Sequence, residues 1–97
     1  MFCFEVYTRR NDKLLAVCDS EILDETLENS DVNYVVDSSF YGEKEADSDR
    51  VLELAEKCSL INAIGNEVVQ LLVDNDFVDS DRITKIDGID HAQVVKV

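Results

Sequence analysis

The stretch from Ser48 to Asn75, SDRVLELAEKCSLINAIGNEVVQLLVDN, decides which fold class this chain can adopt. Its apolar residues recur at alternating steps of three and four, which is the spacing of one buried face of an α-helix. This stripe is formed by Val51, Leu54, Cys58, Ile61, Gly65, Val68 and Leu72, and it is widened by Ala55 and Val69. The spacing therefore predicts a helical segment that begins at Asp47 or Ser48 and ends at Asn75 or Asp76.

One straight helix over this stretch is too long for a chain of this size. It would measure roughly 40 Å at about 1.5 Å per residue, whereas a small domain is only ~30 Å across. We therefore expect a bend, or a pair of helices, near residues 59–62. A lone coiled coil is the alternative, but the stripe is short and Cys58, Asn62 and Gly65 interrupt it.

The N-terminal residues alternate like a half-buried β-strand from Phe2 to Tyr7, and a second short apolar segment follows at residues 14–18. Between them, Asn11 and Asp12 supply turn chemistry, because both residue types tolerate left-handed backbone. The pattern predicts an N-terminal hairpin, whose register stays open by one or two residues.

The rest of the chain divides into shorter elements. We expect an acidic helix at residues 21–28, with Ile22, Leu23 and Leu27 facing inward. Further strands are expected at residues 32–36, 83–86 and 93–97, with a loop at residues 37–42 and a polar, mobile segment at residues 43–47.

These elements predict an α+β fold rather than a doubly wound one, because strands and helices mix without regular alternation. The expected order is strand, strand, helix, strand, helix (bent or paired), strand, strand. We expect residues 1–97 to form a two-layer single domain, with the helices packed on one face of a small mixed β-sheet.

The chain is strongly acidic, with 22 Asp and Glu against 9 Lys and Arg and a net charge of −13. Such a surface repels phosphate groups, so direct nucleic-acid binding is not expected. Two explanations stay open: solubility in a cytosol of high ionic strength, and a docking surface for a basic protein partner. The local exception is a basic hairpin tip with Arg9, Arg10 and Lys13, which leaves RNA binding as a minor option.

The location expected for this chain is the cytoplasm. No apolar run approaches the ~18–20 residues of a membrane span, and the N-terminus lacks the features of a secretion signal. The three cysteines, Cys3, Cys18 and Cys58, form no Cys-x-x-Cys pair. We expect them to be reduced and mostly buried, without a disulfide or a zinc site.

The sequence contains no complete motif for a metal or a nucleotide. An EF-hand loop that began at Asp74 would need Gly at its sixth position and Glu at its twelfth, where Asp79 and Lys85 stand. Glycine-rich phosphate-binding motifs and the Gly-x-Ser-x-Gly motif are absent. We therefore expect neither a cofactor nor a metal.

The best candidate for a functional site lies at the C-terminus, where His91 is the single histidine of the chain. Strand alternation places His91 and Gln93 on one face and Ala92 and Val94 on the other. A core strand would more simply use valine at these positions, because buried polar groups cost stability unless they are bonded. The alternative is that both side chains only hold the turn at Gly88.

Asn62 and the loop residues Phe40, Tyr41 and Gly42 are the expected neighbours of His91 and Gln93. Asn62 is either a buried amide that bonds a loop backbone or a polar group in a pocket. A Cys18–His91 catalytic dyad is a further hypothesis, since it needs only that two strand ends meet at one edge.

Four segments give the chain a resemblance to an archaeal family of small conserved proteins of unknown function. They are Leu15-Ala16-Val17-Cys18-Asp19, Phe40-Tyr41-Gly42, Asn62-Ala63-Ile64-Gly65-Asn66-Glu67 and Gly88-Ile89-Asp90-His91-Ala92-Gln93-Val94-Val95. The chain departs from the family pattern at Glu43 and Asp90, where glycine and proline are often found. The resemblance implies an archaeal cytoplasmic protein with a shared surface, and it implies no activity.

Two functional hypotheses follow from the sequence. The first is a non-enzymatic binding or adaptor module that docks onto a larger complex, in translation or RNA metabolism. The second is a small enzyme or ligand-binding protein with a polar site around His91, Gln93 and Asn62. Whether the protein is an enzyme, and what its oligomeric state is, stay open.

Overall fold

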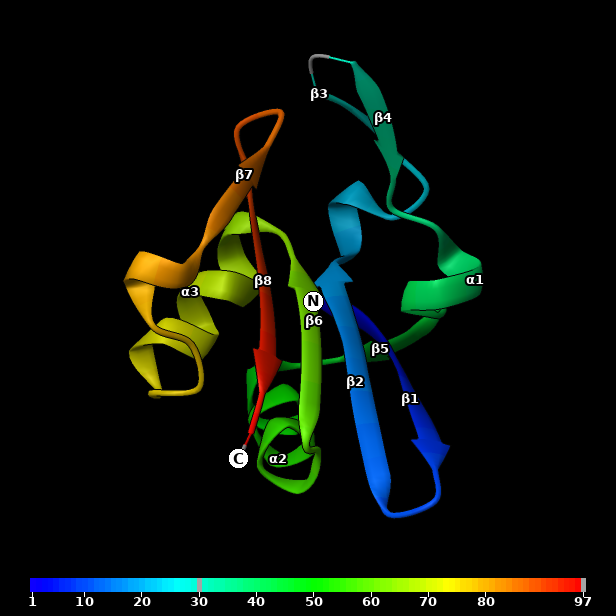
Figure 1. The fold of residues 1–97 in the computed structure, drawn as a ribbon. Helices are drawn as coiled ribbons and strands as arrows, with labels where there is room; N and C mark the ends of the chain where they lie inside the picture. The colour runs from blue at the N-terminus through cyan, green and yellow to red at the C-terminus, as the bar shows by residue number, and fades with distance from the viewer. Residues whose placement is uncertain (30, 97) are drawn as a thin grey trace.

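The computed structural model describes residues 1–29 and 31–96. Its strands are β1 (Phe2–Arg9), β2 (Asp12–Asp19), β3 (Thr26–Asn29), β4 (Val32–Val35), β5 (Lys44–Ala46), β6 (Leu60–Ile64), β7 (Thr84–Ile86) and β8 (Ile89–Val95). Its helices are α1 (Ser38–Tyr41), α2 (Ser48–Lys57) and α3 (Asn66–Asp74), with 3₁₀ turns η1 (Ser20–Ile22) and η2 (Ser80–Arg82). Figure 1 shows their arrangement along the chain.

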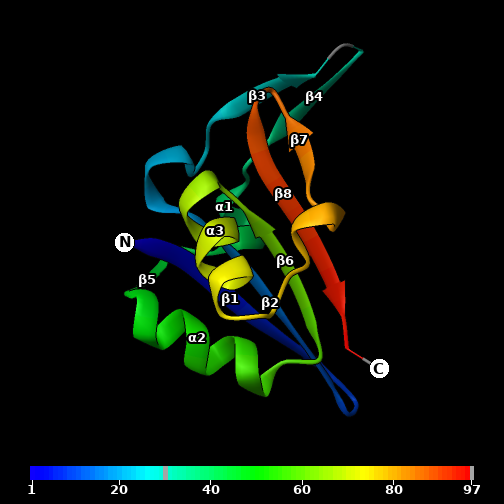
Figure 2. The ribbon, with the colours of Figure 1, turned by 90° about the vertical axis from the view of Figure 1, so that its left-hand side faces the viewer.

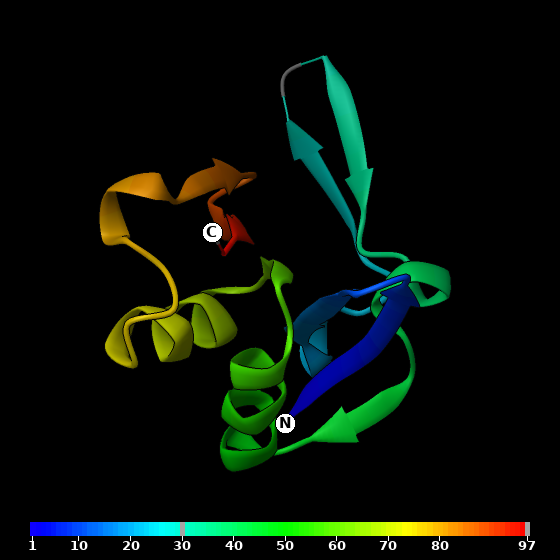
Figure 3. The same ribbon diagram turned by 60° about the horizontal axis from the view of Figure 1, so that its bottom comes forward.

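Six strands form a mixed sheet in the order β5-β1-β2-β6-β8-β7. The pair β2–β6 is parallel, and every other neighbouring pair is antiparallel. A separate hairpin of β3 and β4 projects from the body of the molecule (Figure 3). The α+β class with a mixed sheet is therefore confirmed, and the order of elements roughly matches the predicted one.

The two longer helices, α2 and α3, lie together on one side of the sheet (Figure 2). They cover apolar side chains of alternate strand positions, such as Leu15, Val17, Ile61 and Ala92. The opposite face has a smaller core under α1 and the β3–β4 hairpin. Its buried members are Cys3, Ala16, Cys18, Leu27, Val36, Tyr41 and Ile64. The predicted packing of helices on one face thus describes α2 and α3, whereas the single turn of α1 lies on the other face.

The prediction of continuous helical structure from residue 48 to residue 75 is wrong at its centre, because β6 separates α2 from α3. Ile61 and Ala63 are buried toward the helices, while Ile64 is buried on the other face. Steps of three and four place residues on a helical stripe, but a strand that is buried on both faces satisfies the same apolar pattern. Parallel pairing with β2, which is distant in sequence, selects the strand.

The predicted helix at residues 21–28 is also wrong. The turn η1 ends at Ile22, Asp24 has a positive φ of 67°, and β3 begins at Thr26. A residue with positive φ does not continue a right-handed helix. The backbone N–H of Asp24 instead donates to the carbonyl of Val36, at 2.6 Å, which closes the base of the β3–β4 hairpin.

Two further segments are more regular than predicted. Residues 37–42, expected as a loop, contain the one-turn helix α1, and the carboxylate of Asp37 accepts a hydrogen bond from the Ser39 N–H. Residues 43–47, expected to be mobile, contain β5, which pairs with β1 at the edge of the sheet. Neither the one-turn helix nor the short edge strand carries enough residues to show a period in the sequence.

The N-terminal hairpin is confirmed, and the two C-terminal strands also pair as a hairpin. The register of β1 and β2 pairs Cys3 with Cys18. The turn lies one residue earlier than predicted: Arg10 has the positive φ, and Asp12 already begins β2 opposite Arg9. The predicted strand at residues 83–86 is β7, while the predicted strand at 93–97 begins earlier, at Ile89; Val97 lies outside the described residues. In the turn between them, Asp87 and Gly88 both have positive φ, as a tight hairpin requires. Within residues 1–29 and 31–96, no helix is both long and apolar enough to cross a membrane.

Candidate functional site

A line of hydrogen bonds connects His91 with two tyrosines from outside the sheet. The hydroxyls of Tyr34 and Tyr41 lie 2.6 Å apart, and the Tyr41 hydroxyl donates to Asn62 Oδ1 at 2.8 Å. His91 Nε2 lies 3.2 Å from the same oxygen. These four residues, Tyr34, Tyr41, Asn62 and His91, are called the polar chain below. It joins β4 and α1, which follow each other in the sequence, to β6 and β8, which lie much later in the chain.

The acceptor at the centre of the polar chain fixes the direction of each bond. Asn62 Oδ1 only accepts, so His91 Nε2 carries a proton and donates, and the Tyr41 proton points to Asn62. The Tyr34 hydroxyl then donates to Tyr41. Burial lowers the pKa of His91 below its ordinary value, which favours the neutral ring. Burial, followed by the hydrogen bond with Tyr34, raises the pKa of Tyr41.

Strand register places the polar chain next to an open part of the same sheet face. Asn62 lies opposite Gln93 across β6 and β8, and both side chains point away from α2 and α3. The next row of the sheet pairs Tyr7 with Leu14, Leu14 with Leu60, and Leu60 with Val95. The open face is the name used below for six residues: Tyr7, Leu14, Leu60, Asn62, Gln93 and Val95.

The open face combines exposed apolar groups with amides. Tyr7 is 36% exposed and Val95 69%, which are high values for large apolar side chains. A shallow hollow of about 170 Å³ is lined by Leu14, Leu60, Asn62 and Gln93, among others. Gln93 is exposed, so the donor and acceptor of its amide are accessible to a partner. Such a surface suits contact with another macromolecule.

A second depression, of about 370 Å³, lies beside the polar chain and is lined by Arg82, Thr84, His91 and Gln93. The Thr84 hydroxyl donates to the carbonyl of His91 at 3.4 Å, and β7 pairs these two residues. The sequence reasoning missed Arg82 and Thr84. The hairpin register that follows from the turn at residues 87–88 could have placed Thr84 opposite His91.

The structure brings together some of the predicted site residues and separates others. His91, Asn62 and Tyr41 are joined by hydrogen bonds, and Gln93 is their exposed neighbour. Phe40 makes no hydrogen bond to them but stacks on Tyr7, with ring centroids 5.6 Å apart, and contacts the Tyr41 ring edge-on, with centroids 4.9 Å apart.

Gly42 serves the backbone rather than the site. It has a φ of +80°, and a Cβ on it would overlap the carbonyl of Phe4, so the chain passes close to β1 at this point. Tyr34 was missed by the sequence reasoning, since nothing near it in the chain signals a contact with β8.

The hypothesis of a Cys18–His91 dyad is contradicted. Cys18 pairs with Ile64, and Ile64 pairs with His91, so a whole strand separates the two side chains. At ~4.8 Å between neighbouring strands, their backbones lie roughly 9–10 Å apart. Burial also raises the pKa of Cys18 to about 12, which disfavours the reactive thiolate.

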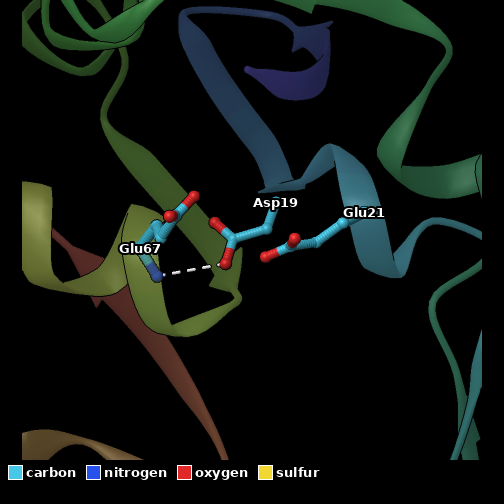
Figure 4. A group of neighbouring side chains, drawn as sticks. All are labelled: Asp19, Glu21 and Glu67. Carbon is cyan, nitrogen blue, oxygen red and sulfur yellow. Dashed lines mark hydrogen bonds between the residues drawn. The ribbon is translucent and has the colours of Figure 1, made fainter.

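A buried carboxylate that the sequence reasoning did not single out caps helix α3. Asp19 is only 3% exposed, and its two oxygens accept from the N–H groups of Val68, at 2.8 Å, and Glu67, at 3.0 Å. Figure 4 shows its carboxylate beside those of Glu21 and Glu67. One oxygen from each lies within 4.8 Å of the others, which is close enough for a shared cation. Both Asp19 oxygens already satisfy the helix N-terminus, so the structural role explains this residue.

Fold and surface together define a small α+β protein with a mixed sheet, one face of which carries a hydrogen-bonded polar chain beside an open face. The chain belongs to the family described as "Protein of unknown function (DUF424)", which matches residues 7–97. The resemblance to an archaeal family without an assigned activity is thereby confirmed.

A solved structure is similar over nearly the whole chain. It is the crystal structure of an uncharacterized conserved protein from Methanopyrus kandleri, with a TM-score of 0.81 and 21% sequence identity. The match covers 99% of this chain and 93% of the other, and it shows a common fold. No curated protein matches the sequence.

Proposed function

We propose that this protein is a non-enzymatic binding module that docks through its open face onto a basic protein in a larger complex, in translation or RNA metabolism. The observation that carries the proposal is the row of Tyr7, Leu14, Leu60 and Val95 across four strands. This row leaves apolar side chains in solvent next to the amides of Asn62 and Gln93. Apolar groups bordered by amides are typical of the centre and rim of protein interfaces.

The charge of the chain supports a basic partner. A net charge of −13 attracts basic surfaces at long range and repels phosphate backbones. The polar chain supports a binding role rather than a catalytic one, because Asn62 Oδ1 already accepts from both Tyr41 and His91. The described cysteines are buried, so none offers an activated nucleophile beside the histidine.

A pair of matched glutamine substitutions tests the proposal. Partners are recovered from a native extract at low and high salt and identified by mass spectrometry, and the affinity of each purified partner is then measured. Gln93→Arg introduces a cation into the open face. Gln70→Arg introduces the same cation on the exposed side of α3, away from that face.

The proposal expects a basic partner whose affinity falls with salt and drops about tenfold or more with Gln93→Arg, the equivalent of ~1.4 kcal/mol. Gln70→Arg should change the affinity by less than about twofold. Equal effects of the two substitutions, or partners that are recovered without regard to charge, would contradict docking through the open face.

A second candidate function is binding of a small ligand in the depression lined by Arg82, Thr84, His91 and Gln93. The Arg82 guanidinium would suit a ligand with acceptor groups. His91→Ala separates this candidate from a structural role. If the variant loses binding but keeps its melting temperature, His91 belongs to a binding site. If the variant unfolds, or recovers every partner unchanged, His91 has no role in binding.

A further inference from the structure

The edge of the main sheet is unpaired along the last residues of β8. β7 pairs with β8 from Ile89 to His91, so Gln93 and Val95 lie beyond its end. The N–H of Lys96 donates to the carbonyl of Ser59, at 2.9 Å, across the β6–β8 pair. Because these groups alternate between the two sides of a strand, the N–H and C=O of Gln93 and Val95 point away from β6. In the part of the chain that the structure describes, they have no backbone partner.

The other edges of this sheet carry charged residues that discourage strand addition. β5 presents Lys44 and Glu45. Where β1 extends beyond β5, the Glu5 carboxylate accepts from the Val6 N–H at 3.3 Å and pairs with Lys44. β7 carries Lys85, which bonds Asp90 at 2.6 Å. The segment Gln93–Val95, called the β8 edge below, is uncharged and lacks this protection.

A depression of about 450 Å³ lies beside the β8 edge and gives room for another chain. Besides residues 93–95, it is lined by Phe77, Val78, Asp76, Asp79 and Arg82. On the side away from β8, Phe77 and Val78 offer apolar contact. The charged groups there are the carboxylates of Asp76 and Asp79 and the guanidinium of Arg82. An extended segment that entered this depression would meet backbone donors and acceptors on one side and the carboxylates of Asp76 and Asp79 on the other. The ammonium of Lys96 lies over the Phe77 ring and donates to the carbonyl of Ala55, so it is already bonded.

We propose that the β8 edge binds an extended basic segment of a partner protein as an added β-strand. The inference deepens the proposed function, on which it rests, by naming the edge and the conformation of the partner. Backbone hydrogen bonds to Gln93 and Val95 supply affinity, and Asp76 and Asp79 select positive side chains. A second copy of this chain is disfavoured as the occupant, because two bodies of net charge −13 repel each other.

The test uses synthetic peptides and therefore does not depend on finding the natural partner. The probe is a short peptide that alternates lysine with valine. One control alternates glutamate with valine, and another replaces each valine with proline, which keeps the charge but removes backbone donors. Calorimetry measures binding to the full chain, and amide hydrogen exchange followed by NMR locates it.

We expect the lysine–valine peptide to bind at least about tenfold more tightly than either control. The amides of Gln93 and Val95 should exchange rapidly in the unbound protein and become protected when this peptide binds. Val95→Pro removes an outward N–H that makes no bond within the sheet, so it should fold and lose about tenfold in affinity. Val95→Thr keeps that N–H and should retain binding. If Val95→Pro does not fold, amide exchange in the natural chain still tests the inference, because the peptide must protect the amides of Gln93 and Val95.

Four results would overturn the inference. Protection at β1, β5 or β7 instead of the β8 edge places the strand elsewhere. Equal binding of the proline peptide means that charge alone acts. Protection of Gln93 and Val95 without peptide, in a dimer seen by sedimentation, makes a second copy the occupant. A partner that depends on Gln93 of the open face but does not protect these amides would leave the docking function standing and remove only strand addition.

Discussion

The carboxylate of Asp19 occupies the space in which a side chain at Gly65 would lie. A Cβ on Gly65 would overlap the Asp19 carboxyl carbon and both of its oxygens, and Gly65 has a φ of +131°, outside the range of most side-chain-bearing residues. Asp19 in turn bonds the N–H groups of Glu67 and Val68. One contact therefore fixes the end of β2, the end of β6 and the start of α3.

Gly65→Ala should destabilise the fold by about 2–4 kcal/mol, because it adds backbone strain and displaces the Asp19 cap. Urea unfolding measures the loss. Gly88→Ala is the matched control, since Gly88 also has a positive φ but no atom lies within 4 Å of its added Cβ. This control should cost only about 1 kcal/mol. Equal costs at the two positions would mean that strain alone acts and that the cap contributes little.

Asp19 should make the stability depend on pH. Burial raises the pKa of Asp19 above its ordinary value of 3.8, although the bonds from the Glu67 and Val68 N–H groups oppose this shift. The protonated Asp19 carboxyl therefore adds to the free energy of unfolding at pH values below the pKa that Asp19 has in the unfolded chain. This contribution is lost as the pH rises through the pKa that Asp19 has in the folded protein. The difference in unfolding free energy between the natural chain and Asp19→Asn should therefore shrink with rising pH.

His91 should titrate below its ordinary pKa. Burial lowers the pKa of this ring, so protonation favours the unfolded chain. The neutral ring stabilises the fold at pH values above the pKa of His91 in the unfolded chain, which is near 6.5. This contribution is lost as the pH falls through the lower pKa of His91 in the folded protein. NMR titration measures this value without ambiguity, because the chain has 1 histidine. A ring that titrates above 6.5 would show that a carboxylate, rather than burial, controls it.

The three thiols should react slowly in the folded protein. Cys3, Cys18 and Cys58 are all buried and unpaired, and burial raises the pKa of both Cys18 and Cys58. A thiol reagent should label them fully only after denaturation, and Cys18 should be the slowest, since the thiolate is the reactive form. Rapid labelling of all three in native buffer, or a disulfide in freshly isolated protein, would be evidence against a closed core.

Binding to RNA should be weak at about 150 mM salt, because the net charge of −13 outweighs the basic tip at the β1–β2 turn. Fluorescence anisotropy with single-stranded and duplex RNA measures this. Micromolar affinity or better would contradict the expectation. The double variant Arg9→Ala, Arg10→Ala would then show whether the hairpin tip is responsible.

Local sequence patterns were sufficient for the N-terminal hairpin and for the fold class. Alternation from Phe2 to Tyr7 and the turn chemistry of Asn11 and Asp12 predict β1 and β2, because each strand finds its partner only a few residues away. The same alternation in β8 correctly separates His91 from Ala92, which are on opposite faces. The sequence by itself thus determined which residues of these strands share a face.

Only the tertiary structure decided the identity of β6 and the surroundings of His91. Residues 60–64 fit a helix as well as a buried strand by pattern, and pairing with β2, more than forty residues earlier, settles the choice. Tyr41 reaches Asn62, and Tyr34 reaches Tyr41, because α1 and the β3–β4 hairpin fold across the sheet. The physical reason is that such contacts gain their energy from burial and pairing between distant segments, whereas periodicity reports only on the local backbone.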